Sequence, residues 1–337
     1  MSDSWQDLRL QQLLDVRLCD LRLKLAGSWV EPRVNTVLQE LARLGLRFRP
    51  HFWFSDEWFS PVGVPGVAIP FYLAHPKLIR LERQQMLEAE GGTATDCKRL
   101  LRHEIGHAVQ HGYALHRRPR WQELFGLASE PYPDHYAPDP NTRDYVHHLD
   151  SWYAQSHPSE DFAETFAVWA SPRSNWRKQY DKWPALEKLT YVDKVMKEVS
   201  DRPPPHRGRS RPGGLEGMRI RLRTHYQRRR ERYQVGDPTS YDRDLLRLFT
   251  PSVTAVGQSA PSFLLQFRRE IRESVAKWTG ENLFAVDQVL NEFIIRCREL
   301  KLRAVGSPRT LQMDVALLVS VHTMTLLHLR RQTWVQV

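Results

Sequence analysis

The feature that most constrains this 337-residue chain is a helical stretch at residues 96–112, which reads DCKRLLRHEIGHAVQHG. His103 and His107 stand four residues apart, so on an α-helix they share one face about one turn apart. Two imidazoles at that spacing can converge on one metal ion, and neutral imidazole is a good zinc ligand. An apolar stripe that would hold the helix in a core runs beside them: Leu100, Leu101, Ile105, Ala108 and Val109.

Glu104 follows the first histidine and can reach a water molecule on that metal without being a ligand itself. Zinc lowers the pKa of such a water to about 7, and a carboxylate beside it can take the remaining proton. The run is the H-E-x-x-H signature, which also arises by chance and therefore needs a helical context. Here Thr95 or Asp96 can cap the helix, and Gly112 can end it.

Two histidines leave a catalytic zinc site incomplete, because such sites carry three protein ligands and one open position. A metzincin would supply a histidine three turns further on, but Tyr113 stands there. His111 continues the four-residue spacing, yet on a straight helix it lies one turn too far to reach the same ion. We therefore expect His111 to be solvated or to play a supporting part.

Glu160 and Glu164, in the run HPSEDFAETFAVW at residues 157–169, are the candidates for the missing group. A helical pair at this spacing lets one carboxylate bind zinc while the other accepts a hydrogen bond from a ligating histidine. Two solvated helix carboxylates are the alternative, although the surrounding Phe and Ala residues suggest burial. Asp161 is a further ligand candidate, but it stands off the face that Glu160 and Glu164 share.

With these two runs together, the sequence resembles the gluzincin metallopeptidases. HEIGHAVQHGY and EDFAETFAVW are similar to the H-E-x-G-H-A and E-x-F-A-E-x-F motifs of the anthrax lethal factor catalytic domain. The longer runs WYAQSHPSEDFAETFAVW and PGVAIPFYLAHPKL are more similar still to uncharacterised bacterial zinc-binding metallopeptidases. The likeness covers roughly residues 20–200.

The resemblance implies an α+β, zincin-like (gluzincin) domain with a small sheet and active-site helices. It implies Zn²⁺ held by His103, His107 and Glu160, with Glu104 as the base and Glu164 in a supporting position. The expected activity is hydrolysis of peptide bonds in a peptide or protein substrate, by Glu-assisted attack of zinc-bound water. The C-terminal part does not resemble lethal factor, so that protein's substrate and partners do not carry over.

Tyr153 is the candidate for stabilising the developing oxyanion. It lies seven residues before Glu160, at the end of a long loop at 129–158, and an active-site tyrosine has the same offset in the lethal-factor motif. A phenol donor aimed at that oxygen stabilises its charge. His157 and Tyr145 are competing donors, and a packed structural tyrosine is the alternative.

Alternating apolar residues predict strands at 47–54 and 67–74, and Pro70 would confine the second strand to a sheet edge. Such an edge could take an extended substrate by strand addition, or it could be an ordinary edge. Apolar periodicity predicts helices near residues 10–25, 32–45, 186–199, 260–278, 282–302 and 308–331.

Charge divides the chain unevenly. Residues 1–200 hold 25 Lys and Arg against 26 Asp and Glu, whereas residues 201–337 hold 24 against 13. We therefore expect a metallopeptidase domain at 1–200, a Pro/Gly/Arg-rich linker at 201–216 and a basic, mainly helical region at 217–337. The stretch Arg219–Arg232 could bind nucleic acid or an acidic partner, or could be a solvated helix face.

Composition suggests a cytoplasmic protein with no membrane segment. No run approaches 18 apolar residues, and the first ten residues contain acidic groups and no apolar run that would suggest a signal peptide. The three cysteines are odd in number and far apart, which is typical of reduced thiols.

Two rival functions stay open at this point. One is a nucleic-acid- or protein-binding module with a non-catalytic metal site, and the other is a zinc hydrolase of a non-peptide amide. A structural site has no need for Glu104, which argues against the first; the sequence does not separate the second from a peptidase.

Overall fold

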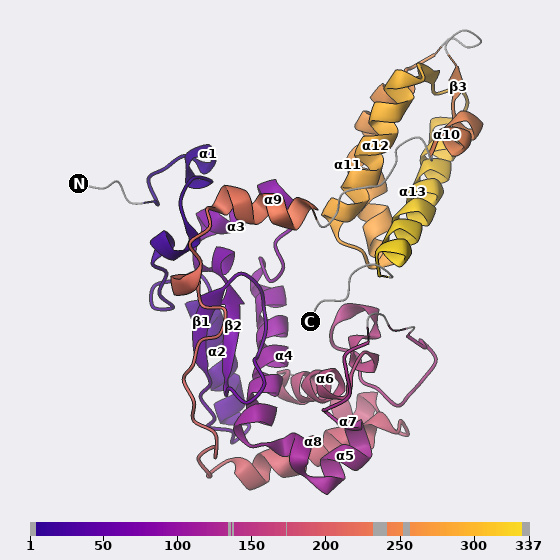
Figure 1. The fold of residues 1–337 in the computed structure, drawn as a ribbon. Coiled ribbons are helices and arrows are strands. Elements are labelled where there is room, and N and C mark those ends of the chain that lie inside the picture. The colour runs from indigo at the N-terminus through magenta and orange to yellow at the C-terminus, as the bar shows by residue number, and fades with distance from the viewer. Residues whose placement is uncertain are drawn as a thin grey trace. The chain divides into compact units, whose positions relative to one another are not determined.

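The computed structural model describes residues 5–133, 136, 138–172, 174–231, 241–251 and 257–331. The chain forms two compact units (Figure 1). The first comprises Met1–Gln85 and Ala89–Thr224, and the second comprises Met86–Glu88 and His225–Val337. Both are mostly helical with little strand, which is compatible with an α+β class.

The sheet of the first unit has two parallel strands, β1 (His51–Ser55) and β2 (Gly66–Pro70), paired from His51 with Gly66 to Ser55 with Pro70. The strand expected at 67–74 ends at Pro70, and the chain continues as a buried 3₁₀ turn, Phe71–Ala74. Ala68 also pairs with Phe59 in an antiparallel bridge, its amide donating to the Phe59 carbonyl at 2.8 Å. The chain itself therefore meets the other edge of β2 at Ala68.

Helix α4 (Ala94–Gly112) is the centre of the first unit and packs against α2 (Glu31–Arg43), α6 (Pro158–Ala170) and β2 (Figure 1). Its cap is Thr93, not Thr95 or Asp96, because the Thr93 hydroxyl accepts the Asp96 amide at 3.2 Å. The apolar stripe beside the histidines is buried, and so are the polar residues His103, Glu104, His107 and His111.

Helix α6 begins where two signals coincide. The His157 side chain accepts the Ser159 amide at 3.1 Å, and Pro158 occupies the first turn, where its missing N–H costs nothing. The helix crosses α4 at close range, since a Cβ added to Gly106 would lie 3.0 Å from the Ala163 Cα. Small residues on both helices allow this approach.

The first unit also contains the helices α3 (Pro76–Met86), α5 (Pro119–Phe125), α7 (Trp176–Gln179) and α8 (Ala185–Val199), and α6 contacts both α5 and α8. Further 3₁₀ turns lie at Leu115–Arg117, Asp150–Gln155 and Leu215–Gly217. The loop at 129–158 thus contains a 3₁₀ turn just before α6.

The prediction of one helix near residues 10–25 is wrong. The chain forms only α1 (Leu10–Leu13) and a 3₁₀ turn at Leu18–Leu21, with Leu13, Leu18 and Leu21 buried. The segment between them pairs with residues 218–223, as in the bonds from the Leu222 amide to the Val16 carbonyl at 2.9 Å and from the Leu18 amide to the Ile220 carbonyl at 3.0 Å. Pairing with a distant segment outweighs the local helical periodicity.

Residues 201–216, here called the strap, run along β1. Side chains of His51, Trp53 and Ser55, which share one face of the strand, contact the carbonyl oxygens of Ser210, Pro212 and Gly213 at 2.8, 3.0 and 2.6 Å, respectively. That this segment serves as a linker between two domains stays a prediction.

The second unit is a helical bundle. It contains α10 (Asp242–Leu248), α11 (Ala260–Thr279), α12 (Leu283–Glu299) and α13 (Pro308–Arg331), with β3 (Thr250–Pro251) antiparallel to β4 (Leu302–Arg303). The three helical patterns expected there form α11, α12 and α13. Their apolar faces make one core, which includes Leu264, Ile271, Val289, Phe293, Val315 and Val319.

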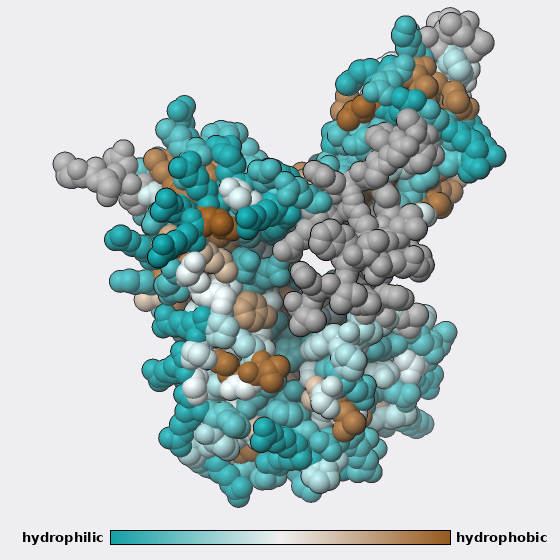
Figure 2. Space-filling model, in the orientation of Figure 1, coloured by the Kyte–Doolittle hydropathy of each residue, from teal (hydrophilic) through white to brown (hydrophobic). Residues whose placement is uncertain are grey.

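The surface is mainly hydrophilic on the face drawn in Figure 2, with small separate hydrophobic patches. In the part of the chain that the structure describes, no helix combines the length and apolarity needed to cross a membrane. Cys19, Cys97 and Cys297 are free thiols.

We expect Gly106→Ala to destabilise the first unit by about 1–3 kcal/mol, the usual cost of overpacking a core. The added methyl group would press on the Ala163 backbone, so it should also widen the gap between α4 and α6. Thermal unfolding followed by circular dichroism measures the change. Gly208→Ala is the matched control, because a Cβ there meets no atom of the described chain within 4 Å; equal melting temperatures for the two variants would contradict the tight packing.

Candidate metal centre

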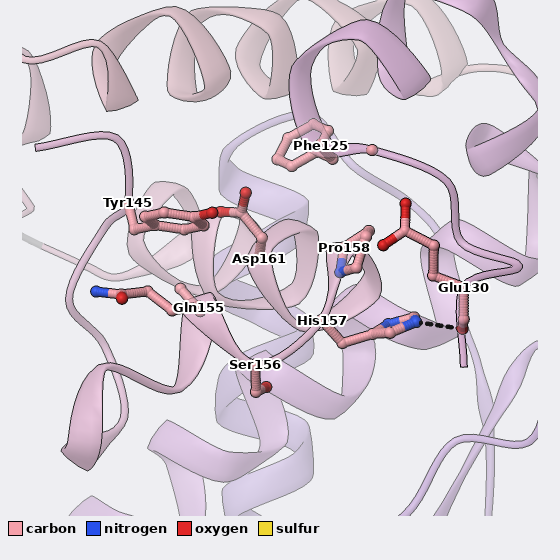
Figure 3. A pocket seen from close by; sticks show the side chains of 10 residues that line it. Phe125, Glu130, Tyr145, Gln155, Ser156, His157, Pro158 and Asp161 are labelled. Carbon is pink, nitrogen blue, oxygen red and sulfur yellow. Dashed lines mark hydrogen bonds between the residues drawn. The ribbon is translucent and has the colours of Figure 1, made fainter. Parts of the chain in front are cut away.

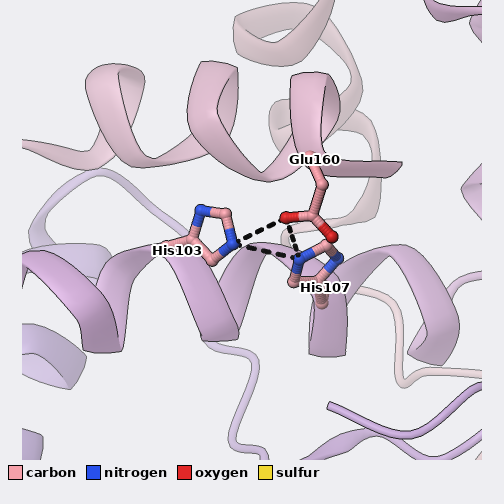
Figure 4. Close-up of side chains that lie close together, drawn as sticks. All are labelled: His103, His107 and Glu160. Atoms are coloured by element: carbon pink, nitrogen blue, oxygen red, sulfur yellow. Dashed lines mark hydrogen bonds and ion pairs between the residues drawn. The ribbon is translucent and has the colours of Figure 1, made fainter. Parts of the chain in front are cut away.

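Two helices bring three possible ligands together. His103 and His107 project from one face of α4, and Glu160 projects from the first turn of α6 toward both rings (Figure 4). All three side chains are buried, with exposed fractions of 3%, 7% and 5%. Among the described residues, they are the group of metal-binding side chains whose ligand atoms lie within 4.8 Å of one another.

The three inward atoms form a nearly equilateral triangle. His103 Nε2 lies 3.0 Å from Glu160 Oε2, His107 Nε2 lies 3.2 Å from the same oxygen, and the two nitrogens are 3.1 Å apart. Tetrahedral ligands about 2.0–2.1 Å from zinc would be roughly 3.3 Å apart, so the triangle fits one such ion. Burial acts to raise the pKa of Glu160, but the two histidines outweigh it and hold that pKa well below its usual value.

Glu164, one turn along α6, holds the far side of the His103 ring. Nδ1 of His103 donates to Glu164 Oε1 at 2.7 Å, and the other carboxylate oxygen accepts the Leu149 amide at 2.7 Å. Fixing the proton on Nδ1 leaves Nε2 as the nitrogen that faces Glu160, which is the arrangement a metal ligand needs. Burial acts to lower the pKa of His103. Hydrogen bonds with Glu160 and Glu164 outweigh this effect and raise the pKa of His103 to about 10.

Glu104 is buried beside the two histidines, with 7% of its surface exposed. Its backbone carbonyl accepts the Ser60 hydroxyl at 2.9 Å, whereas its carboxylate atom Oε2 has no hydrogen-bond partner in the described chain. Burial raises the pKa of this carboxyl group. A buried oxygen without a partner is costly, and it suits a group that would face a water molecule or a cation.

Tyr153 lies beside the cluster, with its ring centroid 5.9 Å from that of His103. Burial, with the nearby Glu160 and Glu104 carboxylates, raises the pKa of its phenol, so the hydroxyl keeps its proton. The preceding residue, Trp152, has a φ of 51°, a left-handed conformation that is uncommon for a bulky side chain and occurs at functional sites.

Tyr132 is a neighbour that the sequence analysis missed. Its hydroxyl donates to Glu160 Oε1 at 2.7 Å, and its ring stacks on His157 with centroids 3.8 Å apart. It belongs to the tyrosine-rich loop at 129–158, whose length was the only sequence signal for it. Tyr132 therefore touches the carboxylate that faces the two histidines.

The two donors considered against Tyr153 have other contacts. The ring of His157 caps α6 through Nδ1 and lies 2.9 Å from the Glu130 carbonyl through Nε2. Tyr145 lies under the Lys188 ammonium group, which is 4.2 Å from its ring centroid. Both residues are thus engaged outside the triangle.

Asp161, the other ligand candidate, is not part of the triangle. Its carboxylate accepts the Lys188 ammonium group at 2.6 Å, and burial raises its pKa to about 7. It forms part of the wall of a cavity of about 220 Å³ (Figure 3). Other residues around this cavity are Phe125, Glu130, Tyr145, Gln155, His157 and Pro158.

Comparison with known families gives one result: residues 95–173 match the model of a family described as "Putative zinc-binding metallo-peptidase". The matched segment holds both histidines, Glu104, Glu160 and Glu164. No curated protein and no solved structure matches the chain. The match and the His–His–Glu cluster agree on a site that can hold a metal.

We expect purified protein to carry about one equivalent of metal at this triangle. His103→Ala/His107→Ala and Glu160→Ala should lose it, because each removes part of the ligand set. Glu164→Ala should instead weaken metal affinity by roughly 10–100-fold, the usual cost of losing a residue that orients a ligand. Elemental analysis and chelator competition measure both effects.

Glu123→Ala is the control for these variants, since this exposed carboxylate of α5 pairs only with Arg120 in the described structure. Metal loss in Glu164→Ala together with retention in Glu160→Ala would mean that the two carboxylates have exchanged roles. Unchanged metal in the double histidine variant would rule out the triangle.

Proposed function

We propose that this chain is a zinc-dependent peptidase of the gluzincin type, related in its site to the lethal factor catalytic domain. The observation that carries the proposal is the unpartnered buried Glu104 carboxylate oxygen beside the triangle of His103, His107 and Glu160. A site that only stabilised the fold would gain nothing from that costly group.

Zinc is the proposed metal because two imidazoles and one carboxylate suit it. When bound, zinc polarises the carbonyl of the scissile bond and makes water a stronger acid. His103, His107 and Glu160 would hold the ion, and Glu164 keeps His103 in the tautomer that presents Nε2.

Glu104 is the proposed general base. Its carboxylate takes a proton from the attacking water and later gives it to the leaving amine, so the reaction needs no second acid. The phenol of Tyr153, which keeps its proton, donates a hydrogen bond to the oxygen that becomes negative during attack. Tyr132 positions Glu160 through the bond to Oε1.

The alternative hypothesis of a binding module with a non-catalytic metal site is less well supported, because it leaves Glu104 without a role. A hydrolase of a non-peptide amide would use the same residues. The hypothesis that an extended substrate adds as a strand to the edge of β2 loses some support, because Phe59 already pairs with Ala68 at that edge. A cytoplasmic location is part of the proposal and rests on the three free thiols.

The basic stretch Arg219–Arg232 is proposed to contact nucleic acid or another acidic partner. Arg223 is already paired with Asp15 at 3.0 Å, and Arg232 lies outside the described residues. Binding of labelled DNA or RNA should weaken steeply with added salt, because phosphate contacts release counterions. No binding at low salt would exclude nucleic acid.

Glu104→Gln should abolish peptide cleavage while the metal stays bound, because the residue is assigned proton transfer and not ligation. Digestion of an unbiased peptide library by the two purified proteins measures this and gives the cleavage preference. If the library stays intact with the metal-loaded wild-type protein, the peptidase reading is wrong; if both proteins cleave equally, Glu104 is not the base.

Tyr153→Phe should keep its metal and lower kcat by roughly 10²-fold or more, the scale for loss of one oxyanion donor. Tyr132→Phe should mainly weaken metal binding, by roughly 10–100-fold, because its hydroxyl bonds a proposed ligand. Steady-state kinetics at saturating zinc separates the two effects. A normal kcat for Tyr153→Phe beside a depressed one for Tyr132→Phe would move the oxyanion role to Tyr132.

A further inference from the structure

Three histidines outside the triangle gather at the C-terminal end of α4. His111 is on its last turn, and His116 is on the following 3₁₀ turn, with ring centroids 6.0 Å apart and planes 70° apart. His206 comes from the strap, where its amide donates to the Gly112 carbonyl at 3.2 Å. Segments about 90 residues apart in sequence thus place three imidazoles near one another.

Two ring nitrogens of this group are orphaned. Nδ1 of His111 and Nδ1 of His116 are both buried and have no hydrogen-bond partner in the part of the chain that the structure describes. His111 is only 7% exposed, so the expectation that it is solvated is wrong. Buried polar atoms are nearly always satisfied, so two such nitrogens on rings whose centroids are 6.0 Å apart suggest a ligand that both can bind.

The protonation state of these rings suits a cation. Burial lowers the pKa of His111 to about 3, and burial also lowers the pKa of His116, with smaller contributions from nearby positive groups. Both rings are therefore neutral at physiological pH, which is the form that binds metals. Nδ1 of each neutral ring can carry the lone pair that a metal needs, because neither nitrogen has a hydrogen-bond partner in the described chain.

The pair resembles the first centre in its geometry. The rings of His111 and His116 are inclined at 70°, similar to the 78° between His103 and His107, although their centroids are 6.0 Å apart and not 4.8 Å. The site also lies at a helix C-terminus, where the last carbonyl groups favour a positive charge.

We propose that His111, His116 and His206 form a second site for a divalent transition metal such as zinc, separate from the triangle. His111 and His116 supply the two buried Nδ1 atoms, and the exposed His206 turns inward as the third ligand, with water completing the shell. The described arrangement is wider than the triangle, so closure of this site needs that movement of His206.

The consequence of the second site would be to fasten the strap to α4. The strap is already tied at its start, where the Tyr113 hydroxyl donates to the Arg202 carbonyl at 2.8 Å, and at its end along β1. His206 lies between these points, next to the exposed residues Arg207 and Arg209. Metal binding would hold this middle part against the end of the helix.

Titration with zinc, followed by equilibrium dialysis, tests the proposal. Wild-type protein should take up about two equivalents, whereas His116→Ala and His206→Ala should each take up one. These residues are partly or fully exposed, so their variants should fold. His75→Ala is the matched control and should keep two equivalents, because its Nδ1 is already bonded to the Lys77 amide at 3.1 Å.

Saturation of the wild-type protein at one equivalent, or two equivalents in both variants, would overturn the second site. The His103→Ala/His107→Ala protein keeps the test independent of the proposed peptidase, since it should still bind one equivalent. In that background, zinc should slow trypsin cleavage after Arg207 and Arg209, and His116→Ala should remove the protection. Cleavage at the same rate with and without zinc would contradict a metal-held strap.

Discussion

The candidate centre depends on the close crossing of α4 and α6. Gly106 and Ala163 meet where even a Cβ on the glycine would come within 3.0 Å of the facing backbone. His103 and His107 need only one helix to be neighbours, but Glu160 is 53 residues away from His107 and reaches them only across this contact. Because the three ligand atoms are 3.0–3.2 Å apart, a small separation of the helices would open the triangle. The packing of two apolar helix faces thus sets the coordination chemistry.

The centre also concentrates buried polar groups that are costly unless each has a task. Glu164 uses both carboxylate oxygens, one on His103 and one on the Leu149 amide. Glu160 uses one oxygen on the histidines and the other on Tyr132. Glu104 retains an unpartnered oxygen, at an expected cost of about 1–3 kcal/mol. The unpartnered Glu104 oxygen thus lowers the stability of the fold at the position where proton transfer is proposed. Proteins often lose stability in this way at functional sites.

The sequence predicts those features of the site that depend on residues near one another in the chain, and it predicts less well the contacts that depend on the tertiary fold. The neighbourhood of His103 and His107 follows from helical spacing alone. Spacing and apolar surroundings made Glu160 and Glu164 candidates, but the choice of Glu160 as the ligand depended on a family resemblance, because no local pattern encodes which helices pack together. Tyr132 could not be found, since it lies in a loop without periodicity and its contact is set by the fold. The helix expected near residues 10–25 failed for the opposite reason: a clear leucine period was overridden by pairing with residues 218–223. The roles of Glu104 and Tyr153 stay proposals, because geometry alone does not show turnover.

The most direct test of the account is anomalous diffraction at the zinc edge from crystals of the protein purified without added metal. The account predicts its strongest peak about 2.0–2.1 Å from His103 Nε2, His107 Nε2 and Glu160 Oε2, with the open position beside the Glu104 carboxylate. If the strongest peak is held by other residues, or if no peak lies within this triangle, the account is contradicted.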